Sequence, residues 1–286
     1  MNTAALLAFI KERHAIYLRR KAKQPWPWTN DPILREYRFC NVYRNLDKET
    51  ALIHKNWLFD KSRPVDPDAW FAMTVARLVN WWPSLEEVGY PVPWSPKRFT
   101  RALDGRKARG EKVFTGAYMI RADRHPFGKP AYLAEEVLSP LWEAREEVRP
   151  RAGDSLDDFH QRLLPFKDIG SFMAGQIVAD TKYAPGGWLK VAKDWKTWAC
   201  SGPGSQRGLN RVLGMNVDST WNECTWRANF SDLHADMVSL VKEAGLPYIT
   251  GQDLQNCLCE FDKYERVRLG EGRPRSLYHP PSQGAK

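Results

Sequence analysis

Apolar residues recur every three or four positions along most of this 286-residue chain, the spacing that gives an α-helix one apolar face. Serine, threonine or aspartate precedes several of these segments, as is typical of helix N-termini. The pattern predicts helices over 3–23, 35–50, a segment opened by Asp66-Pro67, 97–109 after Ser95-Pro96, 131–147, a segment opened by Ser155 and Asp158, a segment containing Phe172 to Val178, a segment after Pro185-Gly186-Gly187, a segment from Ser231 to Gly245, and 250–270 after Thr250.

The stretch from Leu163 to Gly214 carries the most distinctive turns. One helix is predicted to end at Leu164-Pro165, before a tight turn at 168–170, and a later helical pattern is predicted to end at 202–205. A glycine turn before a helix exposes backbone N–H groups, and the helix N-terminus adds partial positive charge. Both turns therefore suit a phosphate chain. They are equally typical of ordinary connections between helices, so both interpretations stay open.

Helices with short connections and no internal repeat indicate an all-α fold. A hydrophobic fraction of 43% is that of a globular protein. We divide the sequence into a basic N-terminal helical part over 1–150, a second helical part over 151–270 and a tail over 271–286 expected to be loop or disordered. Together these parts are expected to form one compact unit.

The charge is strongly basic and unevenly distributed. Net charge is +9, and residues 1–150 carry 26 Lys and Arg against 18 Asp and Glu. Residues 97–112 hold seven basic and two acidic side chains, among them Arg98 and Arg101. Such a surplus favours a polyanion such as nucleic acid, with contacts along its phosphate backbone. Solubility alone is the alternative explanation.

The cysteines argue against a disulfide framework and against a structural zinc site. They are scattered, odd in number and without a CxxC pair, which indicates a reducing compartment. No metal-ligand spacing stands out elsewhere. No apolar run reaches transmembrane length and no signal-peptide pattern opens the chain, so no membrane partner is expected. The five are Cys40, Cys200, Cys224, Cys257 and Cys259.

Residues 35–50 hold a candidate diphosphate-binding face. In a helix, Tyr37, Asn41 and Arg44 would share one side at i, i+4 and i+7. Arg38 and Arg44 would supply guanidinium groups, whose planar geometry matches phosphate oxygens. A surface helix with solvated arginines would show the same pattern.

The last predicted helix has a polar side opposite its apolar stripe. Asn256, Glu260 and Lys263 lie at i, i+4 and i+7, with Gln255 and Asp262 beside them. An amide can read a base edge, a carboxylate can act as general base and a lysine can serve as its charge partner. The alternative is a solvent face with ordinary ion pairing between neighbouring side chains.

Part of the central stretch resembles the helix-hairpin-helix of the DNA glycosylase superfamily. The resemblance lies in Leu164-Pro165, Asp168-Ile169-Gly170 and Ala174, with Asp194 near the place of that superfamily's aspartate. Here an aspartate replaces the first glycine of the hairpin turn. Phe172 stands where lyase-type members keep a lysine nucleophile, so the resemblance does not imply a Schiff-base mechanism.

A second resemblance covers residues 35–265. It is to the phage amino acid:DNA transferase family of thymine hypermodification, the α-glutamyl/putrescinyl-thymine pyrophosphorylases. A similar helical domain accompanies the 5-hydroxymethyluracil DNA kinases. The motifs that carry it are Tyr37 to Arg44, Gly170 to Gln176 with Asp180, Gly202-Pro203-Gly204-Ser205, and Gln255 to Tyr264.

The resemblance implies a reaction on double-stranded DNA that carries a modified thymine. The amine of an amino acid such as glycine would replace the pyrophosphate of 5-pyrophosphoryloxymethyl-deoxyuridine, after that base has left the stack. It implies a helix-hairpin-helix glycosylase-like fold with additional N-terminal helices, and a place of action in the cytoplasm of the infected bacterial host. The co-substrate is the amino acid. A divalent cation is compatible with pyrophosphate chemistry.

Residues are assigned to the steps that this reaction requires. Pyrophosphate binding is assigned to Arg38, Arg44, Gly202, Gly204, Ser205 and Arg207. Catalysis is assigned to the carboxylates Asp194, Glu260 and Asp262 as candidate bases, with Lys263 as charge partner. Base or substrate binding is assigned to Asn41, Gln255 and Asn256, and DNA binding to Gly170, Ser171, Arg98 and Arg101.

Two other functions stay open. A monofunctional DNA glycosylase would use Asp194 to stabilise the sugar cation and would release a free base. A non-catalytic helical domain would bind DNA with the salt dependence of phosphate contacts and turn nothing over.

Overall fold

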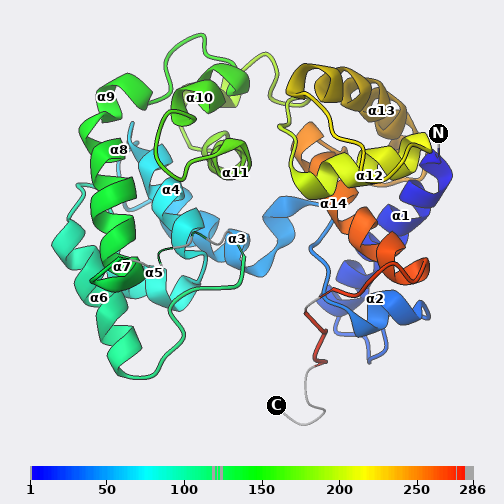
Figure 1. The fold of residues 1–286 in the computed structure, drawn as a ribbon, viewed down its shortest axis with the longest axis horizontal. Helices are drawn as coiled ribbons and strands as arrows, with labels where there is room; N and C mark the ends of the chain where they lie inside the picture. Colours follow the sequence, from blue (N-terminus) through cyan, green and yellow to red (C-terminus); the bar gives the residue numbers. More distant parts are fainter. Residues whose placement is uncertain (1, 118–119, 121, 123–124, 275, 281–286) are drawn as a thin grey trace. The chain divides into compact units, whose positions relative to one another are not determined.

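A computed structural model describes residues 2–117, 120, 122, 125–274 and 276–280 of the chain. Across these residues the regular structure is helical, and β-type pairing is limited to an isolated antiparallel bridge between Tyr37 and Leu277 (Figure 1). The all-α fold predicted from the sequence is confirmed. The relation to helix-hairpin-helix glycosylases stays a prediction.

The chain forms two compact units, which we call the terminal unit (1–47 and 199–286) and the central unit (48–198). Their boundaries lie elsewhere than residue 150, where the sequence was divided. The terminal unit contains α1 (Thr3–Lys21), α2 (Pro32–Glu36), the 3₁₀ turn η1 (Arg44–Leu46), α12 (Pro203–Leu213), α13 (Glu223–Glu243) and α14 (Gly251–Arg268). The central unit contains α3 (Lys48–Ile53), the π-helical turn η2 (His54–Leu58), α4 (Ala69–Val79), α5 (Trp82–Val88), α6 (Pro96–Ala108), α7 (Gly128–Tyr132), the π-helical turn η3 (Leu133–Leu138), α8 (Ser139–Glu143), α9 (Arg145–Val148), α10 (Leu156–Leu163), α11 (Ser171–Thr181) and the 3₁₀ turn η4 (Trp188–Val191).

The core of the terminal unit is built around α14. Thr250 caps its N-terminus, as the sequence predicts, and also forms a reciprocal capping box with Asp253. Its apolar side packs with α1 through Phe261 and Phe9, whose ring centroids are 5.9 Å apart. Phe39 joins them at 6.0 Å from Phe9. The packing brings the segment after α2 against α14.

Helices α12 and α14 approach closely because glycines face the contact. A Cβ on Gly204 would lie 2.4 Å from the sulfur of Cys259, and one on Gly208 would lie 2.1 Å from the carbonyl oxygen of Leu258. No side chain fits at either distance. Gly204, which the sequence assigns to a phosphate-binding turn, is therefore also a packing residue.

Gly208→Ala is expected to lower the free energy of unfolding by about 1–3 kcal/mol, because the added methyl group must push the two helices apart. Gly105→Ala in α6 is the matched control. Its Cβ would meet its nearest neighbour at 3.5 Å, and alanine is favoured over glycine in a helix interior by about 1 kcal/mol. Urea denaturation followed by circular dichroism measures both. Equal destabilisation by the two variants would contradict the close-packing account.

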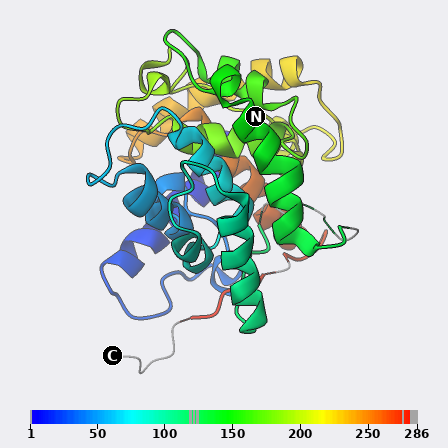
Figure 2. The same ribbon diagram turned by 90° about the vertical axis from the view of Figure 1, so that its left-hand side faces the viewer.

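The core of the central unit is formed by α4, α10 and α11. Figure 2 turns the cyan-to-green helices of this unit toward the viewer. Residues 70–79 of α4 are all buried, and Trp70 meets Phe159 of α10 edge to face at 6.0 Å. Between α10 and α11 the chain turns at Asp168, whose φ of +59° is one that aspartate tolerates better than most residues. The predicted pair of helices with a tight turn is thus present.

Several helix boundaries differ from the prediction. Residues 37–43 are not helical, so the predicted helix over 35–50 is wrong. The pattern after Pro185-Gly186-Gly187 gives only the short turn η4, and Gly202 to Ser205 begins α12 instead of ending a helix. Helix α13 begins eight residues before Ser231, with Asn222 as its cap.

Candidate functional site

Side chains on one face of α14 hold the backbone of residues 38–44. They stand at positions 253, 256, 260 and 263, which are three or four residues apart and so share that face. Their partners run in the opposite direction along the chain. The contacts are Asp253 Oδ1 with Arg44 N (3.1 Å), Asn256 Nδ2 with Asn41 O (3.1 Å), Glu260 Oε2 with Cys40 N (2.9 Å), and Lys263 Nζ with Arg38 O (3.0 Å).

These contacts explain why the segment is extended. Its backbone polar groups bond to α14 side chains, which removes the need for helical hydrogen bonds. The two motifs over 37–44 and 255–264, far apart in the sequence, are therefore one structure. The polar face of α14 meets the protein's own backbone here, which the sequence pattern did not predict.

Asn41 is held from several sides. Its side-chain oxygen accepts from Arg13 at 3.0 Å, its side-chain nitrogen donates to the Leu46 carbonyl at 2.8 Å, and its own N–H donates to Asp47 at 2.9 Å. It is buried, as is Gln255. Base binding by either residue stays a prediction, and each would need to exchange or add partners to perform it.

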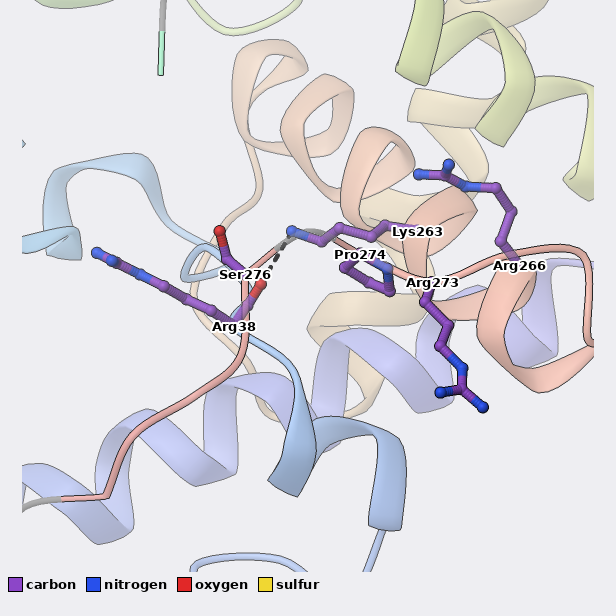
Figure 3. Close-up of a pocket in the computed structure, with 6 residues that line it drawn as sticks. All are labelled: Arg38, Lys263, Arg266, Arg273, Pro274 and Ser276. Carbon is purple, nitrogen blue, oxygen red and sulfur yellow. Dashed lines mark hydrogen bonds between the residues drawn. The ribbon is translucent and has the colours of Figure 1, made fainter. Parts of the chain in front are cut away.

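A basic pocket of about 310 Å³ opens beside residues 38–44, the segment that the α14 side chains bind (Figure 3). Among the described residues, its lining contains four cationic side chains and no acidic one. Figure 3 shows Lys263 reaching toward the Arg38 carbonyl, while the guanidinium groups point in different directions around the pocket. The lining residues are Arg38, Lys263, Arg266, Arg273, Pro274 and Ser276.

The C-terminal segment forms one wall of this pocket. Arg38 N donates to Ser276 O at 3.1 Å, and Tyr278 N donates to Glu36 O at 2.8 Å. The Tyr278 ring stacks on Trp26 with centroids 5.4 Å apart. Within the tail that the sequence predicts as loop or disorder, residues 276–278 therefore form a loop that docks by backbone pairing and aromatic contact.

Carboxylates of α14 stand directly behind the pocket cations. Glu260 pairs with Lys263 at 2.6 Å, and its charge is the main cause that raises the pKa of the Cys40 thiol well above its ordinary value. Asp262 is 2% exposed and pairs with Arg266 at 3.2 Å. Each carboxylate therefore holds the charged group of one pocket cation, Glu260 the ammonium of Lys263 and Asp262 the guanidinium of Arg266. Their assignment as general bases stays a prediction.

Asp262 also connects the pocket to α12. It pairs with Arg207 at 3.3 Å and with Arg211 at 2.8 Å, so one buried carboxylate faces three guanidinium groups together with Arg266. Arg207 pairs in addition with Asp218. At the start of α12, Ser205 Oγ accepts from Gly202 N at 2.9 Å, so a hydroxyl in the first turn satisfies the N–H of the residue that precedes the helix.

The structure divides the sequence-predicted site residues between the units. The terminal unit holds the assigned residues of 38–44, of 202–207 and of α14. The central unit holds Gly170 and Ser171 at the start of α11, Arg98 and Arg101 on α6, and Asp194 after η4. Within the terminal unit, Arg38 and Lys263 line the pocket.

Asp194 contacts the N-terminus of α10. Its two carboxylate oxygens accept from Leu156 N at 2.8 Å and from Asp157 N at 3.2 Å. These amides belong to the first turn, where N–H groups lack partners within the helix. The observed contacts are those of a cap, and a catalytic role stays a prediction.

Asp194→Ala is expected to cost about 1 kcal/mol of stability, the usual effect of losing a helix cap. Asp158→Ala, which removes a capping-box partner from the same helix, is the matched control. Thermal unfolding should be measured together with the rate of pyrophosphate release, the reaction that the sequence resemblance implies. A rate loss confined to Asp194→Ala at similar stability would show that the carboxylate acts in the chemistry.

Four residues of the pocket lining were not assigned to the site from the sequence, Arg266, Arg273, Pro274 and Ser276. Arg266 follows Lys263 by three residues and so shares its face of α14, a spacing that could have identified it. Arg273 and Ser276 lie in the segment assigned to the tail. The only local indication of order there was a tyrosine at 278 among prolines.

Among the helices in the described part of the chain, none combines the length and apolar character needed to cross a bilayer. Within the same residues, histidine, cysteine and carboxylate side chains do not gather in groups of three or more that could hold a metal ion.

The chain matches known proteins over most of its length. The model of a family described as "5-hmdU DNA kinase, helical domain" matches residues 2–273. A 5-hmdU DNA kinase of Bacillus phage SP10 is 26% identical over 232 residues, which are 71% of this chain and 34% of that protein. The chain thus spans about a third of the length of this curated relative. No solved structure matches it.

Proposed function

Because the chain belongs to the family of the 5-hmdU DNA kinase helical domain, we propose that it acts in the hypermodification of thymine in phage DNA. Its proposed substrate is double-stranded DNA that carries 5-pyrophosphoryloxymethyl-deoxyuridine. Its proposed co-substrate is an amino acid such as glycine. The reaction would take place in the infected bacterial cell.

The proposed step is a displacement at the 5-methylene carbon. The nitrogen of the amino acid attacks this carbon as a C–N bond forms, and the C–O bond to pyrophosphate breaks. The bonding electrons leave with pyrophosphate, and a carboxylate takes the proton that the nitrogen gives up. Glu260, Asp262 and Asp194 are the proposed bases, with Lys263 beside Glu260 as charge partner.

The basic pocket is the observation that supports this function best. Pyrophosphate leaves with several negative charges, and cations that hold it lower the barrier to its departure. Among the described residues, four cations line a space of about 310 Å³. Two of them, Arg38 and Lys263, belong to the motifs that carry the resemblance to the amino acid:DNA transferase family. The guanidinium groups do not converge on one point, so long side chains would rotate to meet the phosphates.

The sequence also bears on the reaction type. The 286 residues contain no G-x-x-x-x-G-K-[ST] pattern, the loop with which P-loop enzymes hold the phosphates of a nucleotide. Phosphoryl transfer from ATP by that kind of loop is therefore not proposed for these residues.

The test is incubation of the protein with DNA containing 5-pyrophosphoryloxymethyl-deoxyuridine and a panel of amino acids. Pyrophosphate release is measured by an enzyme-coupled assay, and digested nucleosides are weighed by mass spectrometry. We expect stoichiometric pyrophosphate and a nucleoside whose mass reports the attached amino acid. An abasic site with a free base would instead indicate a glycosylase.

A second candidate is a non-catalytic DNA-binding module. The observation that favours it is the length of the relative, of which this chain matches only 34%. A module of a larger enzyme would bind DNA with a steep salt dependence and release no pyrophosphate. The same assay, with DNA binding measured in parallel, distinguishes the two.

A further inference from the structure

The 3₁₀ turn η4 of the central unit presents apolar side chains to solvent. Trp188 is 53% exposed and Val191 is 80% exposed, whereas Leu189 between them is buried. Val65 is 65% exposed and packs over Gly186, where an added Cβ would lie 2.9 Å from its methyl group. These exposed side chains belong to one small surface, which we call the Trp188 surface (Val65 and 186–193).

Backbone hydrogen bonds stabilise the turn η4. Lys190 N donates to Gly187 O at 3.2 Å, and Ala192 N donates to Leu189 O at 3.2 Å. Of the residues before and after the turn in the sequence, Lys182 is buried, with its ammonium 4.2 Å from the centre of the Trp195 ring. The backbone that carries the exposed ring of Trp188 is therefore ordered before binding, so that binding would have to order only the side chain.

The exposed charged residues that follow Trp188 in the turn are lysines. Lys190 and Lys193 are both exposed, one on each side of Val191. The nearby carboxylates are hydrogen-bonded and keep their charge: Asp194 accepts from α10 amides, and Asp158 accepts from Ser155. Asp158 does lie within electrostatic reach of Lys193, so Lys190 is the less compensated cation.

We propose that the Trp188 surface binds a DNA strand, with Trp188 stacked on an unpaired base and Lys190 and Lys193 on the adjoining phosphates. Aromatic rings flanked by cations are the usual platform for single-stranded nucleic acid, because every base has a π-face. Lysine is depleted from the cores of protein–protein interfaces. The two lysines therefore favour DNA over a protein as the partner of this surface. The inference takes from the proposed function only that DNA is the partner.

An unpaired base is the specific feature that the surface would recognise. Within a duplex both faces of each base are covered by neighbours, so an aromatic ring can stack only where a base has left the helix or the strand is single. A strand disturbed by base flipping offers such a face. The surface would therefore prefer single-stranded or bulged DNA to an intact duplex.

Binding is tested by fluorescence anisotropy with unmodified oligonucleotides, single-stranded, bulged and fully paired, so that the result does not depend on transfer chemistry. Trp188→Ala is expected to weaken binding of the first two about tenfold, and Trp188→Phe to retain most of the affinity. Lys190→Ala/Lys193→Ala should reduce the slope of log affinity against log salt by about 1.4 on single strands. Leu18→Ala and Lys11→Ala/Lys242→Ala, exposed residues of the terminal unit, are the matched controls.

The proposal is overturned if Trp188→Ala, with an unchanged melting temperature, binds every oligonucleotide as the wild type does. It is also overturned if the loss is equal for paired and bulged DNA, because stacking needs an exposed base. If the protein releases no pyrophosphate but its DNA binding still depends on Trp188, the proposed function is contradicted. The proposal for the Trp188 surface is then still supported.

Discussion

Replacing Asp180 with asparagine is expected to destabilise the protein by about 3–5 kcal/mol, a larger loss than that expected for Gly208→Ala or Asp194→Ala. Asp180 is fully buried in the central unit. Its Oδ1 accepts from Arg77 Nη2 at 2.7 Å and lies 3.0 Å from His54 Nε2, and its Oδ2 accepts from Arg77 Nε. The substitution keeps the shape of the side chain and removes its charge.

The reason for so large an effect is the guanidinium left behind. Arg77 is 1% exposed, and its charge would stay in a low-dielectric interior without its carboxylate partner. Asp218→Asn is the matched control. That aspartate also pairs with an arginine, Arg207, but its side chain is 75% exposed, so a loss of at most about 1 kcal/mol is expected.

Chemical denaturation followed by circular dichroism measures the two variants. A companion double variant, Arg77→Met/Asp180→Leu, removes both charges and should be less destabilised than Asp180→Asn alone. If Asp180→Asn and Asp218→Asn lose similar stability, the buried pair is not what holds α4 and α11 together.

Local interactions of the fold were predictable from the sequence. Ser155 with Asp158, Ser95 and Thr250 were identified as helix caps, and each accepts the expected backbone N–H in the structure. A cap depends on residues within one turn, so its sequence pattern is complete in itself. The helices that these caps open were placed correctly for the same reason.

Elsewhere the prediction failed, once because of long-range contacts and once because of a second local cap. Residues 37–43 have helical spacing of apolar positions, but their backbone bonds to α14 side chains more than 200 positions away. The early start of α13 at Glu223 has a local cap in Asn222, upstream of the predicted cap Ser231. Periodicity alone does not choose between two such caps.

The candidate site was predictable in part. Arg38 and Lys263 were assigned from motifs and line the pocket, whereas Arg273 was not assigned because it stands in a segment without periodicity. Residues 276–278, which follow Arg273, pair with residues 36–38. No local sequence pattern predicts this contact. Gly204 shows the opposite case, because a glycine that suits a phosphate also suits the approach of two helices.

The double variant Arg38→Ala/Arg273→Ala is expected to reduce the rate of pyrophosphate release by about 10²-fold or more, the usual consequence of removing groups that stabilise a departing charge. The fold should survive, because Arg38 is held through its backbone. Its N–H donates to Ser276 and its carbonyl accepts from Lys263, and neither contact involves the guanidinium. Quantitative pyrophosphate detection under single-turnover conditions gives the rate.

The matched control is Arg35→Ala/Arg268→Ala, which removes the same charge from exposed arginines of α2 and α14 that do not line the pocket. Both double variants lower net charge equally, so both should weaken general attraction to DNA to a similar degree. Only the pocket variant should lose the chemical step and bind inorganic pyrophosphate more weakly in a competition assay. Equal rate losses in the two would mean that the arginines act through overall charge, and the leaving group would then have to be held somewhere other than this pocket.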